Sequence, residues 1–233
     1  MKVMILAAGK GKRLRPITNR IPKPLVRING VPILAHHFEK LYVAGFRQVF
    51  VNISYLGHLI MKEFGNSYKG LNICYSLEPD PPLETAGGIL FARPWDINNK
   101  PFLVINADVW CDWNVRNAEM IANGKKFENK LAHLVLIDRT VNEEGDFYMQ
   151  NNLLYTKNDK SNNISKKLTY SGIGVYKPGI FNQKNRGKSS KLRTLLEKAI
   201  NNEQVSGEKH TGCWFDIGTT ERLEKLREFT KKE

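Results

Sequence analysis

The chain has 233 residues, 41% of them hydrophobic, which suits one α/β domain or two small ones. No apolar run reaches the length of a membrane span. The short apolar N-terminus, followed at once by glycines and cations, is not typical of a signal peptide. The sequence therefore predicts a cytoplasmic protein without a membrane partner, and its net charge of +13 favours an anionic ligand.

Short apolar runs alternate with helix-like segments from the N-terminus to about residue 137. Strands are predicted at 3–8, 48–53, 71–76, 102–106 and 131–137, and helices at 32–44, 56–64 and 85–92. This alternation is typical of a mostly parallel sheet with helices on both faces.

The pattern changes after residue 146. Two alternating segments, 147–155 and 168–176, flank a polar insert at 158–165 and predict an antiparallel excursion. A helix is then predicted at 190–201, a short strand at 214–217 and a charged amphipathic helix at 219–230. No linker or repeat is visible, so we expect a single domain over 1–233 without a C-terminal hexapeptide-repeat domain.

The cysteines and histidines do not stand at metal-ligand spacings. Cys74, Cys111 and Cys213 are far apart, which favours buried reduced thiols over a disulfide framework or a zinc site. His58, His133 and His210 are isolated, and the five histidines of the chain are interpreted as structural or surface residues.

A basic loop follows the first predicted strand. The cations that precede the first acidic residue, Glu39, are Lys2, Lys10, Lys12, Arg13, Arg15, Arg20, Lys23 and Arg27. Open α/β sheets bind ligands beyond the carboxyl ends of their strands, where this loop is expected. Glycine amides, a planar guanidinium and an ammonium are suited to phosphate oxygens, and the interleaved prolines restrict the loop. These features predict a polyphosphate site.

Known phosphate-binding loops and nucleic-acid modules fit this loop less well. Gly9-x-Gly11 lacks the third glycine of a dinucleotide-binding loop, because Leu14 stands there, and Gly11 replaces the Ser or Thr of a P-loop. No aromatic residue that could stack on bases lies between Met1 and His37. We therefore expect no nucleic-acid partner.

The loop belongs to a longer pattern that resembles the sugar-1-phosphate nucleotidyltransferases. The matching segments are Gly9-x-Gly11-x-Arg13-x-x-Pro16-x-Thr18, Pro22-Lys23-Pro24, Leu83-Glu84-Thr85-Ala86-Gly87-Gly88, Asn106-Ala107-Asp108-Val109 and Trp214-x-Asp216-Ile217-Gly218-Thr219. The resemblance covers essentially the whole chain. It implies a single-domain Rossmann-like α/β fold with a mixed, mostly parallel central sheet. It also implies attack of a sugar 1-phosphate on a nucleoside triphosphate, with release of pyrophosphate.

The resemblance also implies roles for individual residues. Arg13, Lys23 and Asp108 would be catalytic, and Asp108 and Asp216 would bind Mg²⁺. The nucleotide would contact Leu6, Ala7, Ala8, Gly9, Gly11, Lys12, Arg13, Lys23, Glu84, Thr85 and Gly88. The sugar would contact Asn106, Gly145, Asp146, Ser171 and Gly172.

Four further segments are similar to one branch of the family. They lie at 106–110, 145–147, 170–175 and 205–208, and they favour uridylyl transfer from UTP to N-acetylmuramic acid 1-phosphate, giving UDP-N-acetylmuramic acid for peptidoglycan recycling. The alternative is a uridylyl-, thymidylyl- or guanylyltransferase acting on glucose- or mannose-1-phosphate. A catalytically silent sensor of nucleotide sugars is disfavoured by the intact charged residues.

Two departures from the family pattern bear on substrate choice. Many relatives have glycine where this chain has Glu84, so the segment leaves UTP and dTTP both open. Many bacterial relatives carry Glu-Lys-Pro near Glu143–Phe147, and its loss here disfavours an ordinary glucose-1-phosphate enzyme. The lactyl carboxylate of muramic acid calls for a cation near the sugar. Arg139 is a weak candidate, and a solvent-exposed surface role is the favoured interpretation of this residue. A monomer and a homodimer both remain open.

Overall fold

The apolar runs of the sequence form the centre of one mixed sheet. The computed structural model describes residues 1–95, 98–138, 144–157, 166–182 and 186–231, and within these the sheet has ten strands in the order β10-β11-β13-β9-β12-β7-β1-β4-β6-β5. Its core strands are β1 (Lys2–Leu6), β4 (Gln48–Ile53), β6 (Leu71–Leu77), β7 (Phe102–Asn106) and β9 (Ala132–Ile137).

The strands nearest the N-terminus pair in parallel. β1 lies between β4 and β7, and β4 also pairs with β6, so their carboxyl ends meet at one edge of the sheet. β12 (Thr169–Tyr176) runs antiparallel between β7 and β9, while β13 (Val205–His210) pairs in parallel with β9. The predicted mixed, mostly parallel sheet is confirmed.

The predicted antiparallel excursion is confirmed, because β10, β11 and β12 all pair antiparallel with neighbours. The two segments that flank the insert contact each other through one bridge between Phe147 and Leu168. The first segment folds on itself, as β10 (Tyr148–Gln150) and β11 (Leu153–Tyr155), around Asn151 and Asn152. Both asparagines have positive φ, 49° and 64°, the backbone of a tight hairpin turn that asparagine tolerates. The insert at 158–165 lies outside the described residues.

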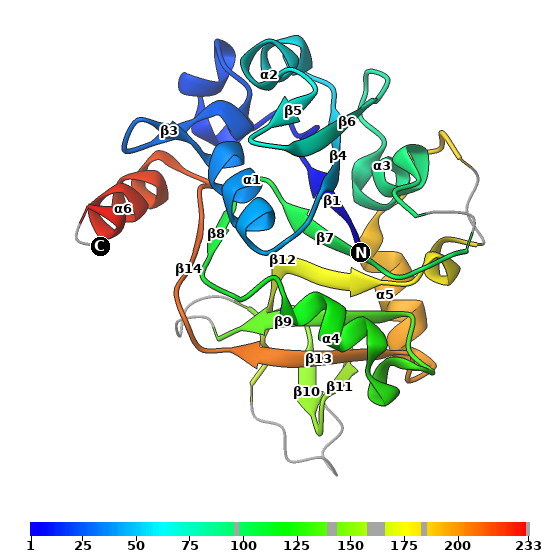
Figure 1. Ribbon diagram of the computed structural model, residues 1–233. Helices are drawn as coiled ribbons and strands as arrows, with labels where there is room; N and C mark the ends of the chain where they lie inside the picture. The colour runs from blue at the N-terminus through cyan, green and yellow to red at the C-terminus, as the bar shows by residue number, and fades with distance from the viewer. Residues whose placement is uncertain (96–97, 139–143, 158–165, 183–185, 232–233) are drawn as a thin grey trace.

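Helices cover both faces of the sheet, as predicted (Figure 1). Residues of α1 (Ile33–Val43), α2 (Gly57–Phe64) and α4 (Asn117–Asn123) belong to one apolar core. Residues of α3 (Glu84–Ala92) and α5 (Leu192–Asn201) belong to a second. Full burial of each large apolar side chain stabilises the fold by about 1.5–3 kcal/mol.

A third, smaller core anchors the basic loop. Leu14, from the loop, packs with Ile217 and with Leu223 of α6 (Thr220–Thr230). Nearby, the short hairpin of β2 (Arg27–Ile28) and β3 (Val31–Pro32) contacts α6, and β5 (Ser67–Tyr68) borders β6 at the edge of the main sheet. The basic N-terminal segment is thus packed against the last helix of the described chain.

A separate two-stranded ribbon joins distant parts of the chain. β8 (Val109–Cys111) pairs antiparallel with β14 (Trp214–Asp216), with Asp216 opposite Val109 and Trp214 opposite Cys111. The Ile217 amide continues the pairing by donating to the Asp108 carbonyl at 2.9 Å. The backbone of Asp216 therefore lies beside that of Asp108, although they come from different halves of the sequence.

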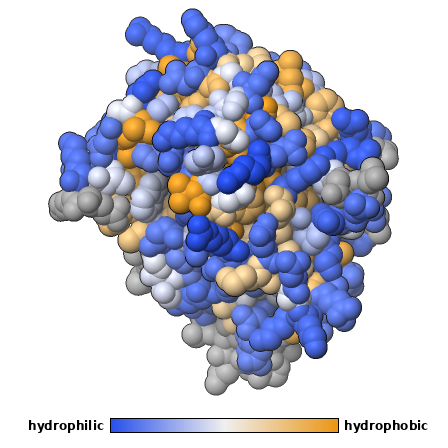
Figure 2. Space-filling model, viewed as in Figure 1, coloured by the Kyte–Doolittle hydropathy of each residue, from blue (hydrophilic) through white to orange (hydrophobic). Residues whose placement is uncertain are grey.

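Hydrophilic residues cover most of the face shown in Figure 2, with apolar residues in smaller areas between them. Within the described ranges, no helix is both long and apolar enough to cross a membrane.

A buried polar network ties the parallel strands to α3. Asn52, at the end of β4, accepts a hydrogen bond from the Ala7 amide (2.8 Å) and donates one to Glu78 (2.6 Å). The other Glu78 oxygen accepts from the Leu83 amide at 2.8 Å, just before α3 begins. Because buried polar groups are costly when left unpaired, this network fixes the chain after β1 relative to α3.

The network predicts that Gly88→Ala destabilises the protein. A Cβ at Gly88 would lie 2.2 Å from Glu78 Oε1 and 2.8 Å from Asn52 Nδ2, so the buried pair would have to separate. We expect a loss of about 1–3 kcal/mol in the free energy of unfolding, measured by urea denaturation. Gly9→Ala is the control, since nothing lies within 4 Å of its Cβ position. Equal stability of the two variants would contradict this account.

Candidate active site

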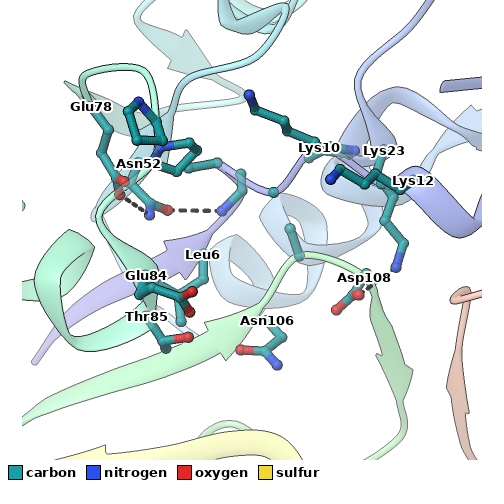
Figure 3. A pocket seen from close by; sticks show the side chains of 18 residues that line it. Leu6, Lys10, Lys12, Lys23, Asn52, Glu78, Glu84, Thr85, Asn106 and Asp108 are labelled. Atoms are coloured by element: carbon teal, nitrogen blue, oxygen red, sulfur yellow. Dashed lines mark hydrogen bonds and ion pairs between the residues drawn. The ribbon is translucent and has the colours of Figure 1, made fainter. Parts of the chain in front are cut away.

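A cleft of about 630 Å³ opens at the carboxyl ends of the parallel strands. Most residues predicted to bind nucleotide line it: Leu6, Ala7, Ala8, Gly9, Gly11, Lys12, Lys23, Glu84 and Thr85, together with Asn106 and Asp108. Figure 3 shows Lys12 and Lys23 on one side and Glu84 and Thr85 on the other, with Leu6 and Asn106 between them.

The basic loop owes its shape to a close turn at Gly11. Its backbone is left-handed, with φ of 60°, and a Cβ there would lie 2.9 Å from Thr18 Cγ2. The buried Thr18 hydroxyl donates to the Gly11 carbonyl at 2.8 Å. The loop then continues as three short 3-10 turns at Lys12–Leu14, Ile17–Asn19 and Lys23–Leu25. Glycine, threonine and proline together direct Lys23 back towards the cleft.

Lys23 forms an ion pair with Asp108 on the basic side of the cleft. The lysine side chain is 12% exposed and the aspartate 33%, so water only partly screens the pair. The pair comes from two loops, one after β1 and one after β7, which neighbouring parallel strands bring together. Two of the predicted catalytic residues are therefore in direct contact.

Asp216 lies next to Asp108 along the ribbon but has its own cation. Its two carboxylate oxygens accept hydrogen bonds from Arg222 Nη1 at 2.6 and 2.7 Å. Two carboxylates from adjacent backbones, each balanced by a side-chain cation, form a donor set that suits Mg²⁺, which takes one or two protein carboxylates. Asp108 and Asp216 are therefore the residues that could hold this ion.

Arg13 lies near Asp216 rather than along the wall of the cleft. It is exposed, and its guanidinium packs 3.3 Å from the Cβ position of Gly218, which is itself 3.4 Å from Asp216 Oδ2. A side chain at Gly218 would contact both the Arg13 guanidinium and the Asp216 carboxylate. The third predicted catalytic residue thus approaches the site from the side of Asp216.

Glu84 and Gly88 occupy different positions in α3. Glu84 lines the cleft with a φ of 62°, a left-handed backbone that favours glycine. This strain gives a physical reason for the glycine found there in many relatives. Gly88 is buried one turn further along, against Asn52 and Glu78, and does not line the cleft. Gly88 leaves room for that network.

His37 packs against the loop that carries Asp108 and holds the backbone of that loop. It lies in α1, is 9% exposed and forms a hydrogen bond with the Ala107 backbone. Burial, aided by the nearby Lys40, lowers the pKa of His37 to about 4, so its ring stays neutral at neutral pH.

A second cavity of about 310 Å³ adjoins the cleft. It shares Glu84, Thr85 and Asn106 with the cleft and is completed by Asp146, Phe147, Tyr170, Lys191, Leu192, Arg193 and Leu196. Asp146 accepts hydrogen bonds from the Tyr170 amide (2.9 Å) and from Arg193 (2.8 Å). Two of the predicted sugar ligands, Asn106 and Asp146, therefore line one cavity.

The other predicted sugar residues, Gly145, Ser171 and Gly172, pack against neighbouring segments instead of lining the cavity. A Cβ at Gly145 would lie 2.6 Å from the Lys167 backbone, and one at Gly172 would lie 2.8 Å from the Asn106 amide. Gly172 also has a φ of 84°. Ser171 is fully buried, and its hydroxyl accepts from the Ile173 amide at 3.2 Å. None of these three residues lines either cavity, and Arg139 lies outside the described residues.

Several contributors to the site were missed in the sequence. Asn52 and Glu78 line the cleft, and Arg222 holds Asp216. The signal for the first two was present, because each is a polar residue at the carboxyl end of an apolar strand. Arg222 lies in α6 and Lys191 immediately precedes α5. Charged residues are common on the exposed faces of such helices, so no sequence pattern distinguishes these two.

Comparison with known proteins places this geometry in a family. The nucleotidyl transferase family model matches residues 2–233. The chain is 40% identical over 230 residues to N-acetylmuramate alpha-1-phosphate uridylyltransferase from Neisseria meningitidis serogroup B, covering 97% of each protein. It is 30% identical over 229 residues to mannose-1-phosphate guanyltransferase beta-A from Xenopus laevis, covering 94% of this chain and 61% of that one.

Solved structures agree on the fold. A structure described as a glucose-1-phosphate thymidylyltransferase from Bacillus anthracis matches with a TM-score of 0.84 at 19% identity, covering 100% of this chain and 96% of that one. An apo UDP-glucose pyrophosphorylase matches with a TM-score of 0.77 at 17% identity, covering 99% and 98%. The chain belongs to the nucleotidyl transferase family, in the group of sugar-1-phosphate nucleotidyltransferases.

Proposed function

We propose that the protein transfers a uridylyl group from UTP to N-acetylmuramic acid 1-phosphate, giving UDP-N-acetylmuramic acid and pyrophosphate. The main support is the arrangement of two adjoining cavities, one lined by the basic loop and one by sugar-type polar groups, with Asn106 at their shared wall. The near full-length similarity to the Neisseria uridylyltransferase supports the choice of substrates.

The chemistry requires two polyanions to approach each other. Two unit charges about 4 Å apart repel by about 4 kcal/mol at an effective dielectric of about 20. Lys12 and Lys23 line the triphosphate side of the cleft, where they would oppose this repulsion and stabilise the charge that develops at the α-phosphate. The attacking phosphate oxygen is largely ionised at neutral pH, so no general base is required.

We further propose that the enzyme depends on Mg²⁺ held by Asp108 and Asp216. The bound ion would supply charge neutralisation between the triphosphate and the attacking phosphate. The chain's own part is to fix the two carboxylates: Lys23 orients Asp108, and Arg222 orients Asp216. Arg13, beside Gly218, would contribute a further positive charge at this end of the cleft.

An acidic sugar is supported by two cations of the second cavity. Arg193 pairs with Asp146 and with Glu197 at 2.7 Å, so its charge is already shared between two carboxylates. Lys191, exposed at the rim just before α5, is the cation that we assign to the lactyl carboxylate of muramic acid. Peptidoglycan recycling, a cytoplasmic location and a monomer or homodimer stay predictions that accompany this proposal.

The substrate assignment is tested by a pyrophosphate-release panel that crosses UTP, dTTP and GTP with the 1-phosphates of N-acetylmuramic acid, N-acetylglucosamine, glucose and mannose. We expect the highest kcat/KM for UTP with N-acetylmuramic acid 1-phosphate. Robust turnover of glucose or mannose 1-phosphate, with none of the muramic acid substrate, would overturn the assignment and leave the reaction class intact.

Lys23→Ala and Asp108→Ala should each lower kcat at least about a hundredfold. The first removes a cation beside the reacting phosphates, and the second removes a carboxylate that would hold Mg²⁺. Both variants should keep the wild-type far-UV circular dichroism. Arg20→Ala is the matched control, since Arg20 lies in the same basic loop but does not line the cleft. Wild-type rates in either cleft variant would remove that residue from the mechanism.

Lys191→Ala should raise the KM for N-acetylmuramic acid 1-phosphate about tenfold and change the KM for N-acetylglucosamine 1-phosphate little. The two sugars differ by the lactyl group, so loss of one ion pair affects only the acidic substrate. Lys198→Ala, towards the other end of α5, is the control. An equal rise for both sugars would show that Lys191 acts on cavity shape rather than on the carboxylate.

A further inference from the structure

A second group of metal-type ligands lies at the far end of the β8–β14 ribbon. Cys111 ends β8, Asp112 follows it, and His210 ends β13. One ligand atom from each, the thiol sulfur, a carboxylate oxygen and an imidazole nitrogen, all lie within 4.8 Å of one another. His210 is 98 residues from Asp112, which explains why their spacing in the sequence did not indicate a site.

The backbone around this cluster is tightly constrained. His210 Nε2 lies 2.6 Å from Asp112 Oδ1, and the Asp112 amide donates to the Cys213 carbonyl at 3.1 Å. Gly212 passes so close that a Cβ there would lie 2.5 Å from Asp112 Oδ1. The glycine therefore allows the carboxylate to sit between the thiol and the imidazole, and the three ligand atoms are held on a small, well-defined surface.

We propose that Cys111, Asp112 and His210 form a binding site for a zinc-type divalent cation, separate from the active site. Thiolate, imidazole and carboxylate are the three ligand types that Zn²⁺ takes in proteins, at about 2.0–2.3 Å. The ion would insert between Asp112 and His210, which requires their contact to widen slightly as the imidazole proton moves to Nδ1. Water would complete the tetrahedron at the fourth position.

The charged groups around the cluster include both cations and anions, so the local charge does not prevent a metal cation from binding. Lys40, from α1, donates to the Cys111 carbonyl at 2.5 Å, and the other ionisable side chains of the neighbouring cavity of about 600 Å³ are His36, His37, Glu39 and Arg116. A thiolate and a carboxylate together would offset a dication even beside the Lys40 ammonium. Because the ion must displace the thiol proton, binding is expected to strengthen as pH rises.

The site would fasten the ribbon that carries the catalytic carboxylates. Cys111 stands three residues after Asp108, and extended backbone rises about 3.3 Å per residue, so the two sites are about 10 Å apart. A metal there would link β8 to the end of β13, across the segment that leads into β14 and Asp216. Its role is therefore structural, and it does not depend on the sugar that the enzyme uses.

The test is titration of the purified, chelator-treated full chain with Co²⁺, followed by absorption spectroscopy. We expect a thiolate-to-cobalt charge-transfer band and the intense d–d bands of a tetrahedral ion, saturating at one equivalent. Cys111→Ser should abolish the charge-transfer band. Asp112→Asn and His210→Gln should weaken Co²⁺ binding more than about tenfold. Zn²⁺ should displace Co²⁺ and raise the melting temperature of the wild type but not of Asp112→Asn.

Two controls separate this site from the rest of the molecule. Cys74→Ser, in β6, should leave the cobalt spectrum unchanged. Asp216→Asn should also keep the charge-transfer band, because its carboxylate belongs to the active site. Absence of the band in the folded wild type at millimolar Co²⁺, or its persistence in Cys111→Ser, would overturn the proposal. Asp112 lies at the surface, so Asp112→Asn is expected to fold and allows Co²⁺ affinity to be measured even if Cys111→Ser does not fold.

Discussion

The ion pair between Lys23 and Asp108 is the contact around which the site is organised. It joins the basic loop after β1 to the loop after β7, and only neighbouring parallel strands could bring these loops together. The six cations between Leu6 and Leu25 would otherwise repel one another on this loop. The pairing of Lys23 with Asp108 gives the loop a defined position, with Lys12 also lining the cleft.

A second constraint lies behind the first. The Asn52–Glu78 network buries polar groups under the chain after β1, and Gly88 leaves the space that it needs. The cleft therefore has a fixed polar wall, with Asn52, Glu84 and Thr85, opposite a cationic one. Preorganised donors of this kind lower the cost of ordering at the moment of binding, which is what an enzyme for two highly charged substrates requires.

Local patterns predicted the parallel strands well. β4 and β7 have the predicted bounds because each contains a run of consecutive apolar residues followed by an asparagine. β13 was missed because Val205–His210 is mostly polar and takes its place through pairing with β9. The turn at Asn151-Asn152, which divides the 147–155 segment into β10 and β11, was not predicted, because the segment reads as one alternating run.

The same contrast holds for the site. Lys23 and Asp108 could be predicted because the first belongs to a dense local motif and the second ends an apolar strand. Contacts such as Arg222 with Asp216 depend on how α6 packs onto the ribbon, which no local pattern encodes. Ser171 and Gly172 matched the family pattern, but their buried positions follow from the irregular register of β12 against β9.

The ribbon of β8 and β14 also has a consequence for how the protein acquires activity. Its two strands come from the middle of the sequence and from near its end, so their pairing closes a very long loop and is intrinsically slow. A folding intermediate with β1, β4 and β6 in place would already have the Asn52–Glu78 side of the cleft, yet it would lack Asp216 beside Asp108. Turnover regained after dilution from denaturant would then lag behind the recovery of secondary structure.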